Sequence, residues 1–197
     1  MPNKVYALLA GVNDYGPDIE SLDGCVNDVD LFHEYLNRHI GPEALAVEVL
    51  KNNDATRANI TSRFRSHLGQ ARSGDVALCQ VCGRGARWAS NAACRESLPD
   101  GKDEGLVCSD SRRPGGYDLA DKELAVLIAE VAGNEAHVAV LFDCCHSGSG
   151  TREVKAARGL KPRLTHEVTT ERPLDTYLDG YYSRLRDAQQ PLFVPTA

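Results

Sequence analysis

The sequence predicts an α/β fold in which a mostly parallel sheet carries helices on both faces. Short apolar runs alternate with segments whose apolar residues recur at helical spacing, an order typical of strand–helix–strand units. The length of 197 residues, with 42% hydrophobic and 25% charged residues, fits one globular domain with a substantial core. Because parallel strands need a crossover connection, usually a helix, the alternation favours a parallel sheet.

The first strand is predicted over residues 5–10, an apolar run that ends at Gly11. A helix follows, because Asn27 can cap an apolar stripe at helical spacing, formed by Val29, Phe32, Tyr35 and Leu36. This helix is expected to stop at Gly41. Residues 45–50 form the next apolar run and predict the second strand.

Thr56 is the predicted cap of a helix over residues 57–71, where apolar residues recur every four positions. Residues 76–81 return to a strand pattern and predict the third strand. Residues 82–118 are too long and too rich in Gly, Pro, Asp and Arg for a simple connection. We expect them to form a functional loop or an excursion over one edge of the sheet.

The last predicted helix opens at Asp121 and ends at Gly133, and a fourth strand follows over residues 137–142. Five basic residues then oppose a single acid between residues 151 and 163, a pattern typical of an exposed flexible segment: Arg152, Lys155, Arg158, Lys161 and Arg163. We therefore expect a catalytic domain over residues 1–150, with a linker and the start of a connection to a further part over 151–197.

The overall charge excludes some functions. A formal net charge of -6 argues against a nucleic-acid-binding surface. No apolar stretch approaches membrane-spanning length and the first residues lack a signal-peptide pattern, so we expect a cytoplasmic protein that binds no membrane. The seven cysteines are an odd number and offer no paired CxxC zinc motif, so reduced thiols and no metal are expected.

Unusual residues follow two of the predicted strands. The third strand runs into CGRG at residues 82–85, and the fourth into DCCHSGSG at 143–150. Functional groups gather beyond the carboxyl ends of parallel strands, so these two turns are expected side by side. Side chains alternate along a strand, so Cys144 and Cys145 should point in opposite directions. Cys145 precedes small residues whose amides can stabilise a thiolate, and it is the better nucleophile of the two.

DCCHSGSG resembles the Asp-x-Cys-His-Ser-Gly motif of caspase-like cysteine peptidases, in particular the metacaspases and bacterial orthocaspases. Three further segments resemble family segments in the right order: YALLAGVNDY, LDGCVNDVDLF and GDVALCQVCGRG. The resemblance covers residues 5 to about 150. It implies a caspase-like three-layer α/β sandwich whose C-terminal small-subunit strands are missing here, and hence a small-subunit partner.

The resemblance also implies roles for individual residues. Cys145 matches the nucleophile, and its own amide together with one near Gly83 would hold the oxyanion. Four residues match positions that line the pocket for the side chain before the cut: Cys25, Asp28, Cys82 and Asp143. Two carboxylates in such a pocket suit Arg or Lys. On local sequence alone, Asp28 is equally well a helix N-terminal acid and Asp143 a turn former.

Position 84 departs from the family pattern. The family's second motif ends in Gly-His-Gly, and Arg84 stands where its general-base histidine would be. Arginine keeps a pKa above about 12, so it can stabilise a Cys145 thiolate by charge but cannot cycle a proton. His146 is next to the nucleophile in sequence but is expected to point away along the turn. We therefore expect impaired peptide cleavage.

Calcium is disfavoured as a cofactor. Calcium-binding metacaspases carry two adjacent aspartates where this chain has Asp121 and Lys122, and an ammonium works against the ion. The carboxylates of four other residues are expected nearby: Asp100, Asp103, Glu104 and Asp118. As a helix cap, Asp121 needs no metal.

Three functions follow from these observations. The first is a cysteine endopeptidase that cuts after Arg or Lys through Cys145, impaired by Arg84. The second is a catalytically inactive caspase-like module that binds peptides or proteins through the same acidic pocket. The third, a cysteine hydrolase or redox-reactive thiol protein of another kind, explains the two glycine-rich turns but not the ordered motifs.

Overall fold

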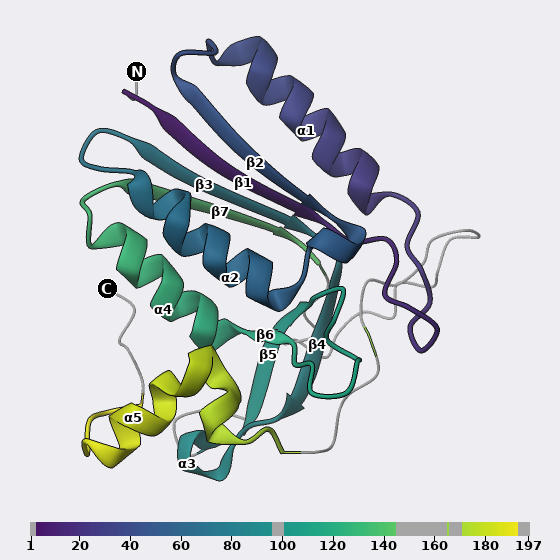
Figure 1. Ribbon diagram of the computed structural model, residues 1–197, viewed down its shortest axis with the longest axis vertical. Helices are drawn as coiled ribbons and strands as arrows, with labels where there is room; N and C mark the ends of the chain where they lie inside the picture. The colour runs from purple at the N-terminus through teal and green to yellow at the C-terminus, as the bar shows by residue number, and fades with distance from the viewer. Residues whose placement is uncertain (1–2, 96–100, 145–164, 166–170, 193–197) are drawn as a thin grey trace.

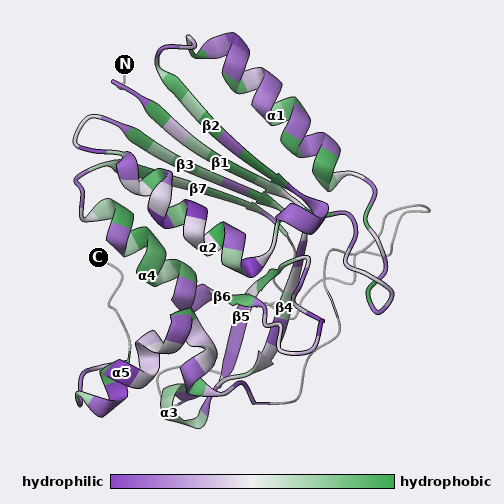
Figure 2. Cartoon of the chain, in the orientation of Figure 1, coloured by the Kyte–Doolittle hydropathy of each residue, from purple (hydrophilic) through white to green (hydrophobic). Residues whose placement is uncertain are grey.

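The computed structural model describes residues 3–95, 101–144, 165 and 171–192, and its centre is a four-stranded parallel sheet (Figure 1). The strands are β1 (Val5–Gly11), β2 (Leu45–Lys51), β3 (Val76–Cys82) and β7 (His137–Asp143), in the order β2-β1-β3-β7. The four predicted strands and their parallel pairing are confirmed. Figure 2 shows hydrophobic residues concentrated along these strands, which agrees with a sheet covered on both faces.

Helices form a layer on each side of this sheet (Figure 1). Helix α1 (Cys25–His39) covers one face, and α2 (Arg57–Ser66) and α4 (Asp121–Ala132) cover the other. Short 3-10 turns, η1 (Asn52–Asp54) and η2 (Leu68–Gln70), flank α2. The three-layer arrangement is the predicted one, although α1 begins two residues before Asn27.

Described residues from the stretch 82–118 and from the two positions after it form a second sheet. Strands β4 (Arg84–Ala89), β5 (Lys102–Val107) and β6 (Leu119–Ala120) pair antiparallel, with the short helix α3 (Ala92–Arg95) after β4. Trp88, Leu106 and Leu119 are buried in it. The excursion we expected is therefore an ordered extension of the core that begins directly after β3.

The chain also packs against the domain near its C-terminal end. A 3-10 helix, η3 (Leu174–Gly180), and helix α5 (Tyr181–Asp187) bury Tyr177 and Tyr182. This part of the segment predicted as linker and connection is held by side-chain packing. The boundary at residue 150 stays a prediction.

Candidate active site

Three strands of the parallel sheet end together at one edge. The pairing register places Gly11 opposite Cys82, and Cys82 opposite Asp143. A Cβ atom on Gly11 would lie 2.8 Å from the carbonyl oxygen of Cys25, so the absent side chain lets the first turn of α1 rest on β1. The edge thus gathers the residues after β3 and β7 with those that open α1.

Three of the four predicted pocket residues meet at this edge. The carboxylate oxygens of Asp28 and Asp143 and the sulfur of Cys82 all lie within 4.8 Å of one another. Asp143 is exposed, Asp28 is half-buried and Cys82 is fully buried. The fourth residue, Cys25, is buried in the first residue of α1. Two acids from distant parts of the chain therefore face a shared space, with a thiol beside them.

Arg84 begins β4 at the same edge and is only 3% exposed. Its Nε and Nη2 donate to the carbonyl oxygen of Glu20 at 3.1 and 2.7 Å. Its backbone N–H donates to the hydroxyl of Tyr15 at 2.7 Å, and burial raises the pKa of that hydroxyl above its usual value. The guanidinium is thus fixed against the loop between β1 and α1. No residue pattern signals this contact, because the acceptor is a backbone carbonyl.

The amide of Gly83 has a different partner from the one we expected. Its N–H donates to the carbonyl oxygen of Asp143 at 3.2 Å, which joins the ends of β3 and β7. An oxyanion would have to displace that carbonyl to use this amide, so the role of Gly83 stays a prediction. Cys145 and His146 lie outside the described residues, and Cys144 is half-buried.

None of the four described histidines lies at the start of β4, where the general base is expected. His137 opens β7, and His39 ends α1, so both lie at the opposite edge of the sheet. The ring Nε2 of His67 is 3.1 Å from the carbonyl oxygen of Ala7, and His33 lies in the middle of α1. In the part of the chain that the structure describes, Arg84 thus holds the position predicted for the base, and its role stays a prediction.

Comparison with known proteins identifies the family. Residues 6–152 match the metacaspase, peptidase C14 domain, which is most of the chain. The chain belongs to the metacaspase family. It is 30% identical to Metacaspase III c of Phaeodactylum tricornutum over 73% of this chain and 42% of that protein. It is 31% identical to Metacaspase-7 of Arabidopsis thaliana over 85% of this chain and 39% of that protein.

The fold is shared with a solved structure. Protein GSU0716 from Geobacter sulfurreducens matches with a TM-score of 0.64 and 23% identity, over 98% of this chain and 67% of that one. Together with the parallel sheet and its two helical layers, this confirms the predicted caspase-like α/β sandwich. The chain spans about two fifths of the length of the metacaspases that it matches.

In this metacaspase domain, cations pair with several of the described carboxylates that were considered for calcium. The Lys122 ammonium lies 2.9 Å from Oδ1 of Asp103, and both side chains are buried. Arg87 pairs with Glu104 at 3.1 Å. Asp100 lies outside the described residues. Lys122 therefore neutralises a carboxylate that a calcium ion would need.

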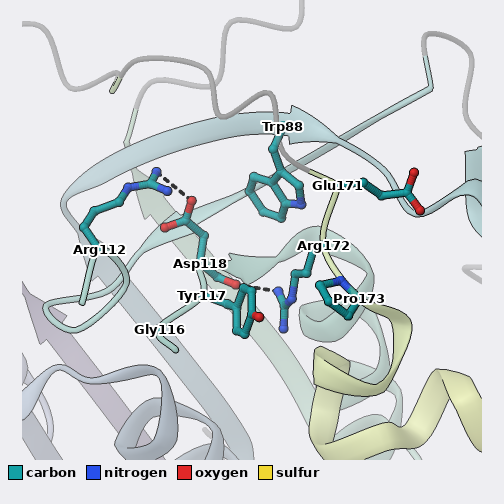
Figure 3. A pocket seen from close by; sticks show the side chains of 8 residues that line it. All are labelled: Trp88, Arg112, Gly116, Tyr117, Asp118, Glu171, Arg172 and Pro173. Carbon is teal, nitrogen blue, oxygen red and sulfur yellow. Dashed lines mark hydrogen bonds and ion pairs between the residues drawn. The ribbon is translucent and has the colours of Figure 1, made fainter. Parts of the chain in front are cut away.

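Asp118 belongs to a separate cavity of about 310 Å³, formed by β4, the loop before β6 and residues 171–173 (Figure 3). Burial raises the pKa of Asp118, although Arg112 pairs with it at 2.8 Å. The backbone carbonyl of Asp118 accepts from Arg172 at 2.8 Å, as Figure 3 shows. Arg112 therefore balances the charge of Asp118, and the other acid that lines the cavity, Glu171, pairs with Arg95 at 2.9 Å.

Proposed function

We propose that this chain is the catalytic domain of a cysteine endopeptidase that cuts after Arg or Lys, with Cys145 as nucleophile and with activity lowered by Arg84. The observation that carries the proposal is the meeting of Asp28, Cys82 and Asp143 within 4.8 Å. Two carboxylates in a pocket can hold a guanidinium through paired hydrogen bonds, or an ammonium as a point charge.

Formation of the acyl-enzyme at Cys145 is expected to need two proton transfers. The Cys145 thiol loses its proton, the thiolate attacks the scissile carbonyl, and the C–N bond breaks as the leaving amine collects a proton. Water then hydrolyses the resulting thioester and restores the thiol. Arg84 can favour the thiolate by charge, but it cannot donate the proton that the leaving amine collects. Loss of a general acid–base group typically lowers the rate by about 10²–10⁴-fold. No cofactor takes part in this sequence of steps.

A second candidate is a catalytically inactive module that binds basic peptides. The contact between Arg84 and the Glu20 carbonyl favours it, because the guanidinium is held by the protein rather than turned toward a substrate. Both candidates use the same pocket, so they differ only in whether a bond is cut.

Cleavage of a fluorogenic peptide that carries Arg directly before the reporter group distinguishes the peptidase from the inactive module. We expect Arg84→His to cut at least about 10²-fold faster than the unchanged chain, and Cys145→Ala to abolish cutting in either background. A peptide with Asp at the same position is the control and should stay intact. Cutting that survives Cys145→Ala would exclude the peptidase proposal. Tight Arg-peptide binding without cutting by Arg84→His would favour the inactive module.

We also propose a small-subunit-like partner and a cytoplasmic location. Leu141 and Phe142 are exposed near the end of β7, an outermost strand of the described sheet, where a further strand could pair. Cys79, Cys94 and Cys108 are buried free thiols, in keeping with a reducing compartment. None of the described helices is both long and apolar enough to cross a membrane.

A further inference from the structure

The pocket at the sheet edge has a donor set that goes beyond what a basic side chain needs. Two carboxylate oxygens would suffice for a guanidinium, but the third atom within 4.8 Å is the sulfur of Cys82. These donors come from three elements: α1 supplies Asp28, β3 supplies Cys82 and β7 supplies Asp143. A thiolate with two carboxylates would bring three negative charges to one point.

We propose that Asp28, Cys82 and Asp143 bind a divalent cation of the zinc class. Calcium and magnesium prefer oxygen ligands, whereas zinc accepts sulfur and oxygen together. The sulfur of Cys82 therefore favours zinc over calcium and magnesium. Three protein ligands leave one position of a tetrahedral ion open to water.

The geometry requires only a small closure. Zinc ligands lie about 2.0–2.3 Å from the metal, which in a tetrahedron puts neighbouring ligand atoms about 3.3–3.8 Å apart. The three atoms are now within 4.8 Å, so a closure of about 1 Å completes the site. Cys82 is fixed, being fully buried on a strand that pairs on both sides, while Asp143 is exposed at a strand end and can turn.

Binding releases a proton. The S–H bond of Cys82 breaks, its sulfur forms the bond to the ion, and the proton passes to solvent, so affinity rises with pH. The effect of zinc on peptide cleavage rests on the proposed function. The ion and a basic side chain would use the same carboxylates, so zinc would exclude an Arg peptide and act as a competitive inhibitor.

Cobalt(II) is the probe, because a cobalt–thiolate bond gives an absorption band that carboxylates alone do not. We expect one equivalent of CoCl₂ to produce this band in the unchanged chain, and ZnCl₂ to displace it. Cys82→Ser should remove the band, and Asp143→Asn should weaken binding about tenfold or more. Asp143 is exposed, so its variant tests the site even where Cys82→Ser perturbs the core.

Cys79→Ser is the matched control. Cys79 lies three residues earlier on β3 and is also fully buried, but an odd spacing places it on the other face of the sheet. It should leave the cobalt band unchanged. Retention of the band in Cys82→Ser, or its loss in Cys79→Ser, would overturn the proposal, as would the absence of saturable binding.

Peptidase activity is not needed for this titration, so the two proposals can fail separately. If Arg84→His cuts the Arg peptide, zinc should raise its KM and leave its kcat unchanged. A fall in kcat at constant KM would contradict the shared pocket. If Arg84→His is inactive, displacement of cobalt by the Arg peptide tests the same competition, and simultaneous binding of both would contradict it.

Discussion

Position 84 places a guanidinium where the resemblance leads us to expect the imidazole of the general base. Its burial requires partners, because an unsatisfied buried charge is costly, and the Glu20 carbonyl supplies one. The arginine is therefore part of the structure that holds the loop between β1 and α1. These contacts explain how the fold accommodates a buried arginine at the position expected for the base.

Gly83 has no room for a side chain. A Cβ atom there would lie 2.7 Å from the hydroxyl of Tyr15, which is buried and accepts from the Arg84 amide. We expect Gly83→Ala to lower the free energy of unfolding by about 1–3 kcal/mol, measured by urea denaturation. Tyr15→Phe removes the clashing oxygen, so the double variant should lose less than the two single variants together. Strict additivity would show that this contact is not the cause.

Asp143 is expected to carry much of the affinity for a basic side chain. In a Cys145→Ala background, Asp143→Asn should weaken binding of an Arg-containing peptide about tenfold or more, because a charge-assisted hydrogen bond is lost. Calorimetric titration measures this. Asp187→Asn is the control, since Asp187 is an exposed acid on α5. Equal weakening by both substitutions would indicate a general charge effect rather than a pocket.

At the level of elements, Glu123 connects α4 to α2 and to the C-terminal segment. Its fully buried carboxylate pairs with Arg57, accepts from Arg172 at 3.0 Å and accepts from the amide of Leu178 at 2.8 Å. We expect Glu123→Gln to cost about 3–5 kcal/mol of unfolding free energy, because the buried Arg172 and the half-buried Arg57 lose their counter-charge. Glu130→Gln, on the same helix but in an exposed pair with Arg65, should cost at most about 1 kcal/mol.

The same carboxylate gives a pH dependence. Burial alone would raise the pKa of Glu123, but Arg172 and Arg57 hold it below its ordinary value of 4.5. The stabilisation is therefore complete above pH 4.5 and is lost as the pH falls through the lower folded-state pKa. Urea denaturation at a series of pH values should show that Glu123→Gln loses less unfolding free energy in acid than the unchanged chain does. If both lose the same amount, groups other than Glu123 cause the loss.

Calcium should not stabilise this chain. The Lys122 ammonium pairs with Asp103, donates to Ser90 at 3.2 Å and lies 4.6 Å from the ring centre of Tyr177. An ion would have to displace this well-satisfied cation. We expect millimolar calcium to leave Tm unchanged within about 1 °C. Millimolar magnesium in the same scan is the control and should also leave Tm unchanged. A rise of several degrees with calcium alone would contradict this.

The sequence predicted the elements whose patterns are local. The apolar runs of β1, β2, β3 and β7 and the stripes of the main helices can be recognised without tertiary information. The pairing of β4 with β5 brings Trp88 opposite Asp103 across a long connection, and no short-range pattern encodes it. Asp28, Cys82 and Asp143 were found through motifs, whereas the Gly83 amide bond depends on backbone geometry that no residue type specifies.

At the level of the whole molecule, β7 is an outermost strand in the described sheet order. Leu141 and Phe142 are 47% and 38% exposed, and their side chains point to opposite faces because they are adjacent on a strand. No single helix could cover both of them. A further strand beside β7 would shield both faces and pair the open edge, which suits a chain that spans about two fifths of its metacaspase relatives.

Without such a strand, the edge of β7 should drive self-association. Unpaired strand edges with apolar side chains are templates for pairing with another chain. We expect sedimentation velocity at rising concentration to show association, and Leu141→Lys with Phe142→Glu to reduce it. Leu31→Lys is the control, because Leu31 is 57% exposed on α1, where no strand edge is available. If Leu31→Lys reduces association as much as the β7 substitutions do, exposed apolar area in general is responsible, and the proposed pairing edge is wrong.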